Sequence, residues 1–97
     1  MAIDFYVHNV LKLSIPINIL DSLDSTQSVL RTKTGRDVDL YSTTTLSPEH
    51  ARLWSNSLRE FARTSAAAQV LKAACVAIAD LLDEAAIGGQ TVLIEGE

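Results

Sequence analysis

Residues 47–87 read SPEHARLWSNSLREFARTSAAAQVLKAACVAIADLLDEAAI, and this stretch decides the fold because it predicts two consecutive helices. The first helix has a clear start at Ser47-Pro48-Glu49. Serine can cap the helix, and proline at the first helical position loses no hydrogen bond. The glutamate places a negative charge near the positive end of the helix dipole. We therefore expect a helix to begin at Pro48.

Each of the two helices has one apolar side. The first, which we expect to end near residue 64, carries Trp54, Leu58 and Phe61 at i, i+4 and i+7. The second, over about 66–87, is rich in alanine, a strong helix former, and Ser65 can cap it. Its apolar side spans about half of the circumference and holds Val70, Leu71, Ala74, Cys75, Ala77, Ile78, Leu81, Leu82 and Ala85. A side this broad suits a helix that packs on two neighbours, or on one neighbour and a second subunit.

Strands are predicted at both ends of the chain. In residues 5–15 apolar and polar side chains alternate with a period of two, and the pattern breaks at Asn9-Val10. This pattern predicts one long strand, or two short strands with a bend at Asn9. Gly88-Gly89 ends the second long helix, and residues 91–95 predict a closing strand. A closing strand this apolar needs a partner, and the amino-terminal strand is the obvious one.

The segment between these elements predicts one more helix and a connector. We expect the helix to start at Ser14-Ile15-Pro16, with Ser14 as its cap, and to run to about Thr32, with Gly35 as a left-handed terminator. Residues 36–46 alternate at Val38 and Leu40 before a threonine-rich stretch, which predicts a loop with one short edge strand. The sequence thus predicts an α+β fold in a single domain, 1–97: three helices packed on a small sheet that pairs the N- and C-terminal strands.

Composition and charge narrow the classes of function. The 97 residues are 47% hydrophobic and 21% charged, and their formal net charge is −4. Residues 66–97 carry one basic and five acidic side chains. A protein that binds duplex nucleic acid usually presents a dense cationic surface instead, so nucleic-acid binding is not expected. One cysteine, no secretory signal and no long apolar run predict a cytoplasmic protein that does not enter a membrane.

Few side chains suit catalysis or metal binding. His8, His50 and Cys75 are the candidates for a nucleophile, a base or a soft-metal ligand, and no metal-ligand spacing links them. We expect Cys75 to pack as a small apolar residue, His8 to lie on the first strand, and His50 to be half-buried. The chain has neither a glycine-rich phosphate loop nor a Gly-x-Ser-x-Gly elbow. The sequence therefore predicts no catalytic residue, no metal site and no cofactor, although an enzyme that uses Cys75 or a histidine stays open as a third hypothesis.

Helical spacing in the sequence predicts two charged surfaces, one on each of the long helices. A polar stripe on the 48–64 helix, nearly opposite its apolar side, is formed by Arg52, Asn56, Arg59 and Arg63. Guanidinium groups in a row can bind carboxylates or phosphates, but a solvated surface is the alternative. On the 66–87 helix Asp80, Asp83 and Glu84 share a second, acidic side. If both apolar sides face one core, these opposite charges are not expected to meet within one subunit.

We therefore favour a small non-enzymatic protein-interaction module, of an adaptor or inhibitor type that includes immunity-like and phage-encoded proteins. It would act by binding a partner protein, and it would form a homo-oligomer. The polar stripe would be its partner- or anion-binding site, and Asp80, Asp83 and Glu84 would form a secondary acidic contact surface. The alternative is a binder of a small anionic ligand, such as a nucleotide, that uses the polar stripe.

Overall fold

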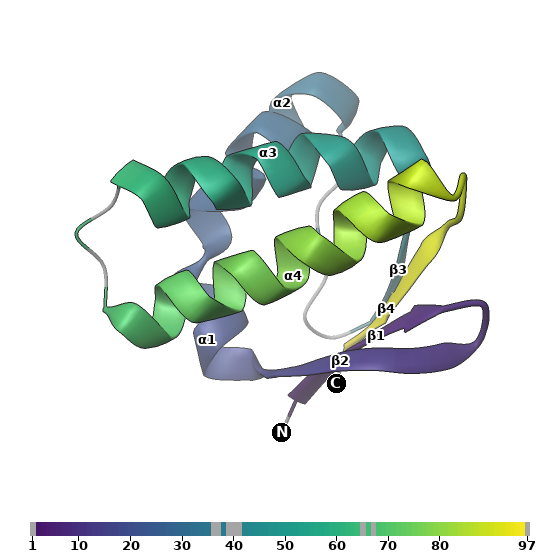
Figure 1. The fold of residues 1–97 in the computed structure, drawn as a ribbon, viewed down its shortest axis with the longest axis horizontal. Coiled ribbons are helices and arrows are strands. Elements are labelled where there is room, and N and C mark those ends of the chain that lie inside the picture. Colours follow the sequence, from purple (N-terminus) through teal and green to yellow (C-terminus); the bar gives the residue numbers. More distant parts are fainter. Residues whose placement is uncertain (1, 36–37, 39–41, 65, 67, 97) are drawn as a thin grey trace.

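The structure, a computed structural model, describes residues 2–35, 38, 42–64, 66 and 68–96. It consists of a small β-sheet with helices packed against it (Figure 1). The two longest helices, α3 (Pro48–Thr64) and α4 (Gln69–Ile87), run side by side in opposite directions over one face of the sheet. This arrangement confirms the α+β class.

The sheet joins the two ends of the chain. Its strands are β1 (Ala2–Val7), β2 (Val10–Pro16), β3 (Thr43–Leu46) and β4 (Val92–Glu95), in the order β2-β1-β4-β3, and every pair is antiparallel. Phe5 of β1 pairs with Ile94 of β4, and Val7 pairs with Val92. The predicted pairing of the N- and C-terminal strands is therefore confirmed.

The amino-terminal pattern forms two strands with a tight turn, the second of the two predicted arrangements. His8 and Asn9 are the turn residues, and their φ angles are 53° and 61°. Two successive left-handed residues are typical of the two-residue hairpin turn that matches the twist of the strands. The prediction that His8 lies on a strand is wrong, because His8 occupies this turn.

The core lies between the inner face of the sheet and the apolar sides of α3 and α4. Burial alternates along β1, where Ile3, Phe5 and Val7 point inward. Trp54 of α3 is fully buried and stacks on Phe5, with ring centroids 6.2 Å apart. As predicted, Trp54, Leu58 and Phe61 pack toward this core, although Phe61 stays partly exposed.

The single helix expected over about 14–32 is wrong. Strand β2 runs to Pro16, and the chain then forms three short pieces: α1 (Ile17–Ser22), a 3₁₀ turn η1 (Asp24–Gln27) and α2 (Ser28–Thr34). The Ser14 hydroxyl donates to Asp4 on the neighbouring strand and does not cap a helix. The Thr26 hydroxyl donates to the Leu23 carbonyl, the kind of local bond by which Ser, Thr and Asp compete with regular helix.

The ends of the helices follow the predicted signals. The Ser47 hydroxyl accepts a hydrogen bond from the His50 amide at 3.2 Å, and Gly35 ends α2 with φ 72°. Helix α4 begins at Gln69, a turn later than expected, and Ser65, its expected cap, lies outside the described residues. The edge strand expected within residues 36–46 forms at Thr43–Leu46. It lies after the alternation at Val38 and Leu40 that predicted it, and Leu40 lies outside the described residues. Within the described residues, no helix is both long and apolar enough to span a bilayer.

Candidate functional site: the polar stripe and the α2–α3 groove

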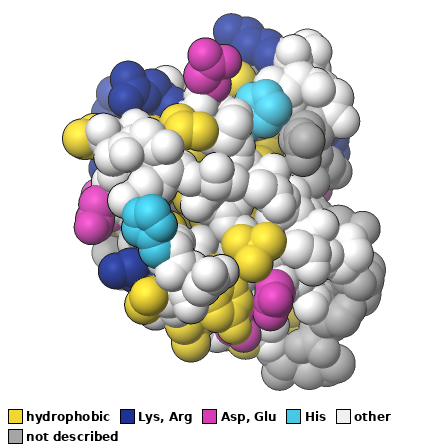
Figure 2. Space-filling model, turned by 90° about the vertical axis from the view of Figure 1, so that its right-hand side faces the viewer, with side chains coloured by type: hydrophobic (Ala, Val, Ile, Leu, Met, Phe, Trp, Pro, Cys, Tyr) yellow, Lys and Arg dark blue, Asp and Glu magenta, His cyan; other side chains and the backbone are white. Residues whose placement is uncertain are grey.

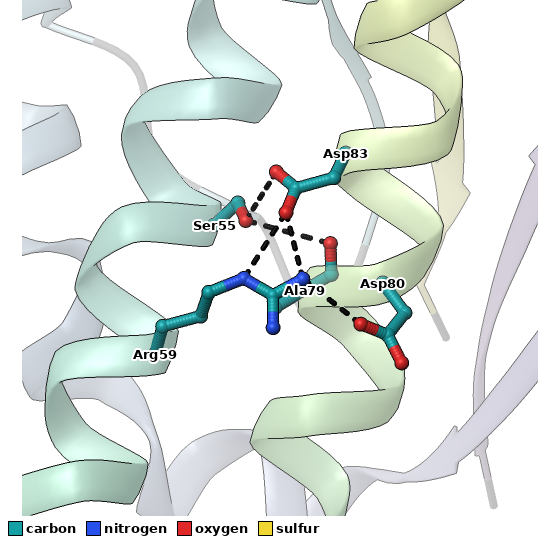
Figure 3. Close-up of polar contacts among 5 residues, drawn as sticks. All are labelled: Ser55, Arg59, Ala79, Asp80 and Asp83. Atoms are coloured by element: carbon teal, nitrogen blue, oxygen red, sulfur yellow. Dashed lines mark hydrogen bonds and ion pairs between the residues drawn. The ribbon is translucent and has the colours of Figure 1, made fainter.

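The polar stripe on α3 divides into parts with different surroundings. Arg59 reaches across to α4: its Nε and Nη2 donate to Asp83 Oδ2 at 3.0 and 2.7 Å, and Nη2 also donates to Asp80 Oδ1 at 2.9 Å (Figure 3). The prediction that these opposite charges cannot meet within one subunit is wrong. Because α3 and α4 lie side by side, their flanks approach each other beside the core, and the long arginine side chain spans the gap.

Ser55 completes this interhelical network and was not singled out by the sequence. Its side chain is fully buried, and its hydroxyl lies 2.6 Å from Asp83 Oδ1 and 3.4 Å from the Ala79 carbonyl oxygen (Figure 3). A small polar residue one turn before Arg59 on the same helix was the only signal for it. The network thus joins a buried hydroxyl to a charge at the surface.

Asp83 is held in its ionised form by this network. Partial burial acts to raise the pKa of Asp83, but hydrogen bonds from Ser55 and Arg59 and the positive charges of Arg59 and Arg52 outweigh it. The pKa of Asp83 therefore lies below its ordinary value, while its two carboxylate partners raise the pKa of Arg59. The guanidinium of Arg59 is thus already neutralised from within the chain, and Arg63 similarly pairs with Glu60 on its own helix.

The other two members of the stripe, Arg52 and Asn56, line a groove between α2 and α3. The groove consists of two adjoining hollows of about 550 and 440 Å³, which share Lys33, Leu53 and Asn56. One hollow lies toward the start of α3 and is completed by Thr34, Glu49, His50 and Arg52. The other extends toward its end and is completed by Ser25, Thr26, Ser57, Glu60 and Phe61. We call this feature the α2–α3 groove.

The groove combines an apolar strip with two available cations. Leu53 and Phe61 are partly buried against the core. Lys33 and Arg52 are exposed and make no ion pair within the described part of the chain. The carboxylates at its rim are Glu49 and Glu60, and Glu60 is already paired with Arg63. Such a surface can bind a ligand that brings both apolar groups and negative charge.

The remaining predicted acidic residue, Glu84, is not part of the network. It lines a separate hollow of about 260 Å³ beside the β1–β2 hairpin, together with His8, Lys12 and Leu81. Asp80, Asp83 and Glu84 are thus split between an ion-pair network and this hollow. Among the described residues, no group of three or more His, Cys, Asp and Glu side chains could hold a metal ion.

The candidate nucleophile and bases lie apart. Cys75 is fully buried in the core, as expected, and burial raises the pKa of its thiol, which disfavours the reactive thiolate. His50 lines the α2–α3 groove and is half-buried, while His8 is exposed in the hairpin turn. In the part of the chain that the structure describes, the Nδ1 atom of His50 is buried and has no hydrogen-bond partner.

Sequence reasoning found Arg52 and Asn56 but not the residues that face them. Nothing in the sequence placed Lys33 or Leu53 next to these residues, and His50 was singled out only as a candidate base or metal ligand. A comparison of the chain with protein-family models, curated proteins and solved structures finds no match. The groove and the surfaces around it are therefore the features of the molecule that bear on function.

Proposed function

We propose that the protein is a non-enzymatic interaction module, of the adaptor or inhibitor type, that binds a segment of a partner protein in the α2–α3 groove. The observation that carries this proposal is the combination of Leu53 and Phe61 with the available cations Lys33 and Arg52 in one groove. A partner segment with apolar side chains and a carboxylate would complement both features. We also propose a cytoplasmic location, since a reducing compartment suits a chain whose single cysteine is a buried free thiol.

The length of the groove suits a short segment. From His50 to Phe61 the helix rises about 16 Å at 1.5 Å per residue. About five residues of extended chain, or three turns of helix, cover that distance. A site of this size makes a weak or transient contact, as expected of an adaptor.

The first prediction concerns the two cations of the groove. Lys33→Glu with Arg52→Glu should weaken binding of the partner at least tenfold, because carboxylates then oppose carboxylates. The partner is identified by affinity capture from the native host with mass spectrometry, and its affinity is measured by calorimetry. Lys12→Glu with Lys72→Glu changes the net charge equally at exposed or half-buried sites outside the groove, and it should retain the affinity. Equal losses in both double variants would contradict the proposal.

A small anionic ligand such as a nucleotide is the second candidate for the same groove. The hollow of about 550 Å³ beside Lys33, His50 and Arg52 lies within the size range of small-molecule sites. Because Arg59 is already bonded to Asp80 and Asp83, the cation to remove is Arg52. A rise in melting temperature with nucleotides or polyphosphates that Arg52→Ala abolishes would favour this candidate over a protein segment.

We further propose that the module forms a homo-oligomer through the outer side of α4. Val70 and Val76 are 59% and 45% exposed there, and the small residue Ala73 lies between them and is also exposed. An isologous helix–helix contact would cover these residues in both copies.

The second prediction tests this contact. Val76→Asp should shift the protein to a monomer in light scattering across a dilution series, because a charge would be buried in the contact. Val10→Asp introduces the same charge at a similarly exposed valine on β2 and should leave the assembly unchanged. A wild-type protein that stays monomeric at high concentration would contradict the homo-oligomer.

A further inference from the structure

The face of the sheet that points away from α3 and α4 carries a second, different surface. Residues paired across antiparallel strands share a face, so the register defines this surface. Tyr6 pairs with Leu11 on one side and with Leu93 on the other, and Asp4 pairs with Glu95. We call these five residues the outer sheet surface.

An apolar row crosses three strands of this surface. Leu11 is 53% exposed, and Tyr6 and Leu93 are half-buried beside it. Figure 2 looks onto the end of the molecule at which the hairpin turns, where hydrophobic and acidic side chains lie close together in the lower part of the view. A tyrosine at the centre of an apolar row is a residue type that contributes strongly to protein interfaces.

The charge of the surface is negative. Among the described residues, the carboxylates of Asp4 and Glu95 lie next to the apolar row, and they directly oppose each other on adjacent strands. Desolvation and the negative charges of Glu95 and Asp4 raise the pKa of Tyr6, so both carboxylates act on the tyrosine. Lys12, on the same strand as Leu11, lines the hollow with Val7, Val10 and Glu84.

We propose that the outer sheet surface is a second docking site, for a protein segment that presents Lys or Arg side chains next to apolar ones. The Cβ atoms of residues that oppose each other on adjacent antiparallel strands lie about 5 Å apart, so one cationic group can contact both carboxylates. The acidic row and the apolar row are separated by two residues along each strand, about 7 Å. An extended segment matches this spacing when its cation and its apolar side chain are two residues apart.

Charge decides against the other occupants. A second copy packed face to face would bring the carboxylates of Asp4 and Glu95 toward their own equivalents, and an acidic segment would meet the same repulsion. The α2–α3 groove carries the opposite charge at Lys33 and Arg52. With both sites, one copy of the chain could bridge an acidic and a basic partner, but the outer sheet surface does not depend on the groove.

The probe for this proposal is a synthetic peptide, Lys-Thr-Leu-Thr-Lys-Thr-Leu, with a counterpart in which glutamate replaces lysine. Binding is followed on the wild-type protein by amide chemical-shift changes and by titration. The lysine peptide should shift amides of β1 and β4, whereas the glutamate peptide should not bind. Affinity should fall as the salt concentration rises, because the carboxylates are exposed to solvent.

Variants separate a specific site from general attraction to an acidic protein. Asp4→Asn with Glu95→Gln should lower the affinity for the lysine peptide at least fivefold. Asp21→Asn with Glu84→Gln removes the same charge at exposed sites elsewhere and should leave the affinity within twofold. Lys33→Glu with Arg52→Glu, the double variant that tests the groove, should not weaken binding of the lysine peptide. Failure of one proposal is therefore distinguishable from failure of the other.

Three results would overturn the proposal. The first is an equal loss of affinity for the lysine peptide in both charge-removing double variants. The second is a set of amide chemical-shift changes confined to the α2–α3 groove. The third is self-association of the chain without any peptide that Leu93→Lys abolishes. The last of these would assign the surface to a second copy. Unchanged melting temperatures of the variants ensure that the comparison is made between folded proteins.

Discussion

Trp54→Ala is expected to lower the free energy of unfolding by about 3–5 kcal/mol, the usual range for removal of a large buried aromatic side chain. Trp54 is fully buried, stacks on Phe5 and donates from Nε1 to the Thr26 hydroxyl oxygen at 2.9 Å. It thus connects α3 to both the sheet and η1. A domain of this size has a total stability of about 5–15 kcal/mol, so the variant should be partly unfolded at moderate temperature. Urea denaturation followed by circular dichroism measures the loss.

Trp54→Phe is the matched control. It keeps a ring beside Phe5 but removes the hydrogen bond to Thr26, whose own hydroxyl still donates to the Leu23 carbonyl. We expect a loss of about 1–2 kcal/mol, since one hydrogen bond and a small volume are removed. A loss in Trp54→Ala no greater than in Trp54→Phe would contradict the role of the ring in joining these elements.

Asp83→Asn is expected to lower the free energy of unfolding at neutral pH by about 1–2 kcal/mol. It removes the carboxylate that accepts from the buried Ser55 hydroxyl and from Arg59 at two positions, and charge-assisted bonds of this kind are stronger than neutral ones. Asp80→Asn is the control, because its carboxylate is 65% exposed and contacts only Arg59 in the described network. We expect a loss below about 1 kcal/mol there.

The pH dependence of stability gives this prediction an independent measurement. The folded protein holds the pKa of Asp83 below its ordinary value of 3.8, so the folded state favours the ionised form. The stabilisation is therefore fully present above that value and is lost as the pH falls through the lower pKa of the folded protein. Asp83→Asn should be less sensitive to acid below about pH 4 than the wild type. An identical acid dependence of the two proteins would show that Asp83 does not carry this stabilisation.

The sequence by itself determined the elements whose signals are local. Ser47 and Pro48 define the start of α3, Gly35 ends α2, and the alternation around Phe5 marks a strand, because caps, left-handed residues and side-chain period act over a few neighbouring residues. The apolar closing strand also predicted its partner. With so few apolar strands in the chain, burial of both required that they pair.

The tertiary structure alone decided what happens between elements. The expected first helix breaks into short pieces around Thr26, because the Thr26 hydroxyl donates to the Leu23 carbonyl and accepts from Trp54, which holds η1 against α3. The angle and separation of α3 and α4 brought Arg59 to Asp83, which helical spacing within either helix does not specify. For the same reason Lys33 came to lie beside Arg52 in the α2–α3 groove: the two are far apart in sequence, and only the packing of one helix on another sets their distance.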